Sequence, residues 1–225
     1  MLELMLDSNG SYPFMHKKLE IRIIAGVTSG LSIVGSLLII LSYICFKVLR
    51  TKAREILMHI SFMDFGCATC NLIGEIVNFH RYYRSCHSEQ CNVSLVINVL
   101  CKTQGSLATF FTLGSIMWTI SLSVYLYILI SQKSPEKAKL FVWFAYVFCY
   151  LMPAGIVTWL VSTKRIGYSP YESTGWCSTV FKNPWTNSRD IFVALFGYNL
   201  WIFLTFVLVP ILSISVHVYI REEVR

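Results

Sequence analysis

Charged residues are scarce in this chain of 225 residues, and the shortage excludes most classes of soluble protein. They make up 14% of the sequence, whereas hydrophobic residues make up 55%, and a soluble domain carries about 25% charged residues. The remaining charges lie mainly between long apolar runs, as a membrane protein requires. The formal net charge is +7, but the basic residues cluster at the ends of these runs, so nucleic acid is not an expected partner.

Several chemical signatures are also missing. The first 22 residues lack the basic start and apolar core of a cleavable signal peptide, so the first apolar run is expected to direct membrane insertion. No His, Cys or carboxylate spacing suits a metal, and no nucleophile–base arrangement or Gly-rich phosphate loop is evident. We therefore expect no enzyme, no cofactor and no metal site. The internal repeats of transporters are not evident either.

Five apolar runs are each long enough to cross a bilayer as a helix. They cover about 23–46, 56–79, 99–130, 140–161 and 191–218, and about 20 apolar residues span a hydrocarbon core about 30 Å thick. The predicted fold is therefore all-α, a polytopic transmembrane helix bundle. Residues 1–22 are expected to form a short extracellular N-terminus, and residues 219–225 a cytoplasmic tail stub.

Sequons and basic residues predict which side is which. Asn9 and Asn92 begin N-glycosylation sequons, one before the first run and one between the second and third. Because helical crossings alternate sides, both sequons fall on the same side. The short connection after the first run contains Arg50, Lys52 and Arg54, and short loops rich in Lys and Arg stay cytoplasmic. We expect a plasma-membrane protein with its N-terminus outside.

Four of the eight cysteines fall on the predicted outer side, where disulfides persist: Cys86, Cys91, Cys101 and Cys177. Four cysteines allow three pairings. We favour Cys101 with Cys177 and a local bond between Cys86 and Cys91. For the local pair, two free loop thiols remain an equal alternative. The other four cysteines lie within the runs and are expected to be free, packed thiols.

One polar stripe runs along the second apolar run. Asn71, Glu75 and Asn78 follow Asp64 at offsets of 7, 11 and 14 residues, which places all four on one helix face. A carboxylate inside a membrane rarely faces lipid, so the stripe should point into the bundle. It is interpreted either as an ion or water site at Asp64 and Asn71 with ligand contacts at Glu75 and Asn78, or as a structural hydrogen-bond network. A protonated Asp64 is a further alternative.

Two more residues are candidates for ligand contact at the outer side. Gln104 lies about one helical turn below Cys101, where a ligand entering from outside could reach it, and a bond to a neighbouring helix is the equal alternative. Trp176 lies in a long aromatic loop. Some aromatic residues of that loop are expected to lie at the membrane interface as an aromatic belt, and others to form a lid over the bundle.

Two strings make the chain resemble a known receptor group. The string Lys164–Tyr168, followed by Gly175-Trp176-Cys177, is similar to the second extracellular loop of the orphan G-protein coupled receptor 157 group. That group is related to the slime-mould cyclic-AMP receptors and, more distantly, to secretin-type receptors. The similarity continues in Cys101, Gln104–Phe110, Trp118-Thr119, Tyr125–Tyr127, Ala53-Arg54, Asp64 and Asn78-Phe79.

The resemblance implies a seven-helix receptor that couples an extracellular stimulus to a heterotrimeric G protein. It also implies that Cys101 and Cys177 tie the third helix to the second outer loop. Further expected partners are an unknown extracellular ligand, the lipid bilayer and a second receptor chain of the same or a different kind. The rhodopsin-type Asp-Arg-Tyr is absent, because Ser123-Val124-Tyr125 stands at the end of the third run.

Only five of the seven expected helices precede Arg225. The chain is therefore interpreted either as a fragment of a receptor or as a genuine five-helix isoform. For the isoform, the alternative function is a non-signalling protein that modulates the trafficking or assembly of a full-length receptor.

Cyclic AMP is not an expected ligand, since no basic phosphate-binding cluster is evident within the runs.

Overall fold

The computed structural model describes residues 13–49, 51–77, 95–168, 177–180, 191 and 195–224. Five long helices dominate these residues: α1 (Pro13–Cys45), α2 (Lys52–Val77), α4 (Leu95–Ile130), α5 (Pro135–Ser162) and α7 (Leu200–Val224). Each of the five contains a segment long and apolar enough to cross a membrane. The prediction of an all-α bundle with five candidate spans is confirmed.

Short elements join the long helices. The 3-10 turn η2 (Lys47–Leu49) follows α1, and the π-helical turn η3 (Leu195–Asn199) leads into α7. Two short strands, β1 (Ile166–Gly167) and β2 (Ser178–Thr179), pair antiparallel after α5. The sequence did not predict this ladder, because two residues are too few to show the alternation that marks a strand.

Four of the long helices begin earlier than the apolar pattern indicates, α1 at Pro13 and α4 at Leu95 among them. Helix α2 starts at Lys52 rather than at residue 56, and α5 starts at Pro135 rather than at residue 140. An apolar run ends where polar residues begin, whereas a helix continues for as long as its backbone groups find partners. Proline suits the start of α5 because its missing N–H would have no partner within the helix there. The consequence for function is that Lys52 and Glu55 belong to α2.

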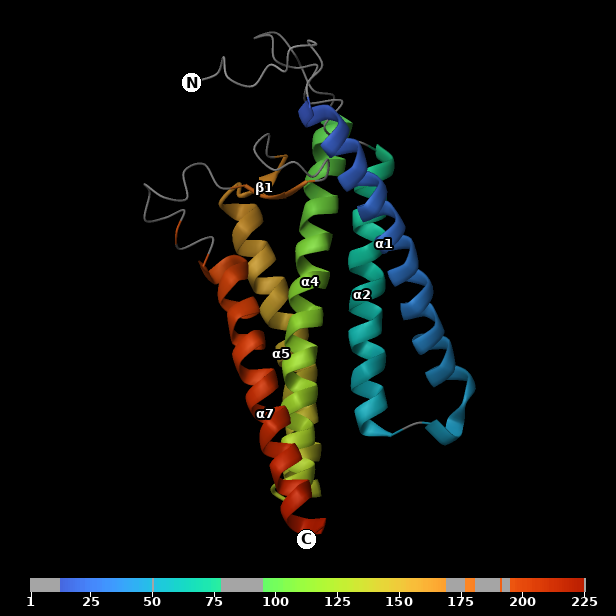
Figure 1. Ribbon diagram of the computed structural model, residues 1–225. Coiled ribbons are helices and arrows are strands. Elements are labelled where there is room, and N and C mark those ends of the chain that lie inside the picture. The colour runs from blue at the N-terminus through green and yellow to red at the C-terminus, as the bar shows by residue number, and fades with distance from the viewer. Residues whose placement is uncertain are drawn as a thin grey trace.

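Helix α4 is the centre of the bundle. It contacts α2, α5 and α7, while α1 packs on α2 (Figure 1). Figure 1 also shows that the start of α1 and strand β1 lie at one end, and the α1–α2 connection and the end of α7 at the other. We call the first the loop end, defined by β1, β2 and Cys177. We call the second the turn end, defined by η2 and the start of α2.

The core lies between α2, α4 and α5. Ile56 and Met63 from α2, Trp118 from α4 and Cys149 from α5 are fully buried in one cluster. The outward faces of the helices are apolar and exposed, as expected where lipid rather than water surrounds the protein. The bundle therefore places its polar side chains at helix contacts and at the two ends.

Small residues on α1 do not all serve the contact with α2. Ser29 and Ser36 are buried, and their spacing of seven residues puts them on one helix face. Gly26, Gly30 and Gly35 would meet nothing within 4 Å if they carried a Cβ. The two serines therefore lie on the buried face of α1, and the glycines lie on other sides of the helix.

Candidate functional site

A disulfide holds the loop end together. Cys101, near the start of α4, is bonded to Cys177, just ahead of β2, with a Cα–Cα distance of 5.4 Å. Both cysteines are buried. The bond fastens the segment after α5 to the central helix, in the pairing favoured from the sequence. Cys86 and Cys91 lie outside the described residues.

Gln104 links three segments beside this disulfide. Its amide nitrogen donates to the backbone oxygen of Cys70 in α2, and its amide oxygen accepts from the backbone N–H of Cys177, both at 3.1 Å. The side chain is 4% exposed. Both polar ends of Gln104 are bonded inside the protein, and one of the bonds reaches the neighbouring helix α2. A ligand contact at Gln104 stays a prediction.

The loop approaches the backbone of α4 at Gly105. A Cβ at this position would lie 3.0 Å from the Cys177 carbonyl oxygen and 3.0 Å from Ile166 Cγ2. Tyr168 packs against the disulfide, and burial raises the pKa of its phenol. At the loop end, the segment after α5 therefore packs tightly against the first turns of α4. Of the remaining pocket candidates, Glu75 is buried near the end of α2, while Asn78 and Trp176 lie outside the described residues.

Asp64, the first residue of the polar stripe of α2, bonds to α4. The Ser115 hydroxyl donates to Asp64 Oδ1 at 2.6 Å, and Cys67 Sγ lies 3.2 Å from Thr112 Oγ1. Asn71 Nδ2 makes a long contact of 3.7 Å with Cys67 Sγ. The first two contacts join α2 to α4, and the third lies within α2. An ion or water site at Asp64 and Asn71 stays a prediction.

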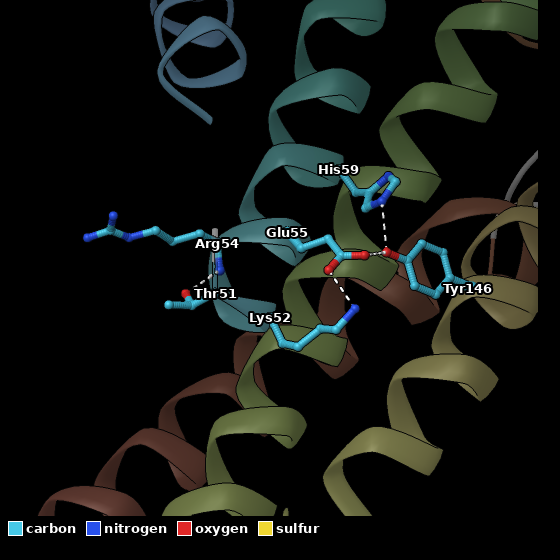
Figure 2. A network of polar contacts seen from close by, with 6 residues as sticks. All are labelled: Thr51, Lys52, Arg54, Glu55, His59 and Tyr146. Carbon is cyan, nitrogen blue, oxygen red and sulfur yellow. Dashed lines mark hydrogen bonds and ion pairs between the residues drawn. The ribbon is translucent and has the colours of Figure 1, made fainter. Parts of the chain in front are cut away.

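A second polar cluster ties α2 to α5 at the turn end (Figure 2). The Tyr146 hydroxyl of α5 donates to Glu55 Oε1. Glu55 Oε2 lies 2.8 Å from Lys52 Nζ, and His59 Nε2 lies 3.2 Å from the Tyr146 oxygen. His59 Nδ1 lies 2.9 Å from the Tyr150 hydroxyl. We call Lys52, Glu55, His59, Tyr146 and Tyr150 the turn-end network.

The donors and acceptors of this network have a consistent direction. Tyr146 uses its proton on Glu55, so its oxygen accepts from His59 Nε2–H. A neutral imidazole that donates from one nitrogen accepts at the other, so His59 Nδ1 accepts from the Tyr150 hydroxyl. The hydrogen bonds therefore run from Tyr150 through His59 and Tyr146 to the Glu55 carboxylate, and all four groups depend on one another.

Trp118 of the central helix supports this arrangement. The His59 ring stacks on it, with centroids 4.7 Å apart and planes 10° from parallel. Tyr146 and Tyr150 meet the same indole edge-on, at 5.3 and 5.8 Å. Aromatic contacts of these geometries are favourable beyond the area they bury. The network thus joins α2, α4 and α5 at one point.

The sequence did not indicate the turn-end network. Glu55 fell outside the run that was predicted to begin at residue 56, and the partners of His59 are distant along the chain. One signal was present: Glu55 and His59 are four residues apart and share a helix face. Ionisable residues inside a membrane helix indicate a functional site by default.

The predicted basic residues of the turn end have different surroundings. Lys52 pairs with Glu55. The backbone N–H of Arg54 lies 3.4 Å from Thr51 Oγ1, and Figure 2 shows its side chain extending away from Glu55 and Tyr146. Arg50 and both sequon residues, Asn9 and Asn92, lie outside the described residues.

Comparison with known proteins places this geometry in context. Residues 18–219 match the family described as 7 transmembrane receptor (Secretin family). The chain is 29% identical over 204 residues to G-protein coupled receptor 157 of Mus musculus, covering 89% of this chain and 56% of the relative. The identity to the Homo sapiens protein of the same name is also 29%, over 89% of this chain and 55% of the relative.

More distant similarity extends to two other proteins. Cyclic AMP receptor-like protein A of Dictyostelium discoideum is 27% identical over 173 residues, which cover 76% of this chain and 40% of the relative. Squid rhodopsin has the same fold, with a TM-score of 0.62 at 17% identity over 99% of this chain and 58% of that structure. The chain spans about half the length of the first two relatives.

Proposed function

Because the chain belongs to the secretin family of seven-transmembrane receptors, we propose that it transmits an extracellular stimulus across the plasma membrane to a heterotrimeric G protein. The family consists of receptors rather than enzymes, and the relatives bear out the resemblance to the G-protein coupled receptor 157 group. The observation that carries the proposal is the family match, which extends from residue 18 in α1 to residue 219 in α7 and so covers most of each of the five long helices.

The proposed orientation has the loop end outside and the turn end in the cytoplasm. Disulfides persist in oxidising compartments, which supports an outer position for Cys101 and Cys177. Lys52 and Arg54 belong to the start of α2, which lies at the opposite end (Figure 1), in agreement with the positive-inside rule. If the orientation is right, enzymatic deglycosylation lowers the apparent mass, and replacing both Asn9 and Asn92 by Gln abolishes that change. An unchanged mass in cells that process other sequons would contradict it.

The proposed mechanism is a shift between two packings of the bundle, biased by a ligand that favours one of them. Helix α4 is fastened to the loop by the disulfide at one end and contributes Trp118 to the turn-end network further along. A stimulus at the loop end would therefore act on α4, and α4 on the network. We propose Glu75, Asn78 and Trp176 as the surroundings of the ligand, with Gln104 as the link from loop to helix.

The test uses a chimera, since the relatives extend beyond the matched region. Residues 1–219 of this chain are joined to the part of mouse G-protein coupled receptor 157 that follows its matched region. Dissociation of Gα from Gβγ is measured in cells, with surface display quantified in parallel. Activation above that of empty cells supports the proposal. A chimera that reaches the surface but activates no Gα class, with or without a stimulus, contradicts the proposal.

A second function is favoured by one observation on α7. No residue of its apolar window is buried, although the helix contacts α4, so most of its surface is open to further helices. A five-helix protein could pair through it with a complete receptor and change the trafficking of that receptor. This function requires an endogenous deglycosylated protein near 25.8 kDa that co-purifies with the complete form. A clearly heavier protein, or failure to co-purify, would exclude it.

A further inference from the structure

A groove between α1 and α2 at the turn end plays no part in the proposed signalling. Its volume is about 310 Å³, and its walls are Leu38, Ile39, Ser42, Tyr43, Arg54 and Leu57. We propose that this groove is a binding site for an anionic glycerophospholipid. In this arrangement, an acyl chain lies along the apolar walls and the phosphate lies at Arg54.

The apolar part of the groove opens toward the bilayer. Leu38, Ile39 and Leu57 are 60%, 50% and 42% exposed, and all three lie within candidate membrane spans. The surrounding medium that reaches these residues is therefore lipid. The volume is at the lower end of the roughly 300–1,000 Å³ found for small-molecule sites, which suits a segment of one acyl chain better than a bulky ring system.

The polar rim favours an anion. Arg54 belongs to the first turn of α2, where the helix dipole is positive. A guanidinium can bind two phosphate oxygens at once. Figure 2 shows that Arg54 points away from Glu55, the acid of this corner, whose two oxygens are already engaged by Lys52 and Tyr146.

The charges around the rim favour binding of an anionic lipid over a zwitterionic one. The described part of this corner carries Lys47, Lys52 and Arg54 against the single acid Glu55. A positive corner at a membrane boundary attracts anionic lipids, which are concentrated in the cytoplasmic leaflet. None of the six wall residues is acidic, so nothing in the wall favours the positive group of a phosphatidylcholine headgroup.

The test is native mass spectrometry of the purified chain with equimolar phosphatidylserine and phosphatidylcholine. We expect about a fivefold preference for phosphatidylserine, the ratio that corresponds to one basic residue at an anionic surface. Arg54→Ala should remove the preference, and Arg54→Lys should retain most of it. Lys137→Ala is the matched control, because Lys137 is an exposed basic residue in the first turn of α5 and lies outside the groove.

A second variant separates the groove from general folding. Ser42→Phe leaves Arg54 in place but puts a ring into the groove, so it should reduce lipid binding while eluting and melting like the wild type. The proposal is overturned if phosphatidylcholine is retained equally well or if Arg54→Ala binds phosphatidylserine like the wild type. It is also overturned if cholesterol, offered in the same mixture, is retained in place of phosphatidylserine. None of these readouts depends on G-protein coupling.

Discussion

Replacing Gln104 by Met should loosen the loop end of α4 while leaving its packing nearly unchanged. Met is close to Gln in length and volume, but it has no amide. Two hydrogen bonds of 3.1 Å are lost, one to the Cys70 carbonyl oxygen and one from the Cys177 N–H. The side chain is 4% exposed, so water cannot readily replace either partner.

The two losses differ in size. A buried N–H left without an acceptor costs about 1–3 kcal/mol, which applies to Cys177. A hydrogen bond between membrane helices contributes about 0.6 kcal/mol on average, which applies to Cys70. Together, the free energy of unfolding should fall by about 2–4 kcal/mol. For a chain of this size, 1 kcal/mol corresponds to roughly 2–4 °C in Tm, so the expected drop is roughly 4–16 °C.

The chain carries its own reporters for this measurement. Cys70 and Cys149 are free, buried thiols that become reactive when the bundle opens. A thiol-reactive dye therefore follows thermal unfolding in detergent, with exposed Cys45 contributing only to the baseline. Thr103→Ala, at an exposed neighbouring position, is the control. If the Tm of Gln104→Met lies within about 1 °C of the control, a margin below the effect of 1 kcal/mol, Gln104 does not fasten the loop as described.

Three further substitutions probe the loop end and the turn-end network. Gly105→Ala should cost about 1–3 kcal/mol by overpacking against the loop, whereas Gly155→Ala, with nothing within 4 Å, should be neutral or stabilise by up to about 1 kcal/mol; equal Tm shifts would contradict the close approach. Cys177→Ser opens a disulfide that closes 76 residues, worth about 4–5 kcal/mol by chain entropy, so surface display measured by flow cytometry should fall sharply, and normal display would make the bond dispensable. Tyr146→Phe removes the hydrogen-bond donor to Glu55, and a hydrogen bond to a charged group contributes about 1.5–3 kcal/mol. Because this bond holds α5 to α2, its loss should raise the basal G-protein activation of the chimera. An unchanged level at equal surface display would show that the turn-end network takes no part in activation.

The membrane-spanning architecture followed from the sequence because its causes are local. A run of about 20 apolar residues is sufficient to define a span, and helical periodicity is sufficient to place Asp64 and Asn71 on one face. The residues that resemble the receptor group likewise pointed to the family to which the chain belongs. The helix boundaries were less accessible, because interfacial residues such as Lys52 and Glu55 join α2 without being apolar.

Tertiary structure alone decided which distant side chains meet. Tyr146 reaches Glu55 from 91 positions further along the chain, and Gln104 reaches Cys177 from 73 positions before it. Periodicity fixes the face of a helix on which a residue lies, but it does not fix the partner, the depth or the rotation at which two helices pack. The central place of α4, the turn-end network and the lipid-facing groove all depend on those three quantities, which are set only when the helices pack together in the bilayer.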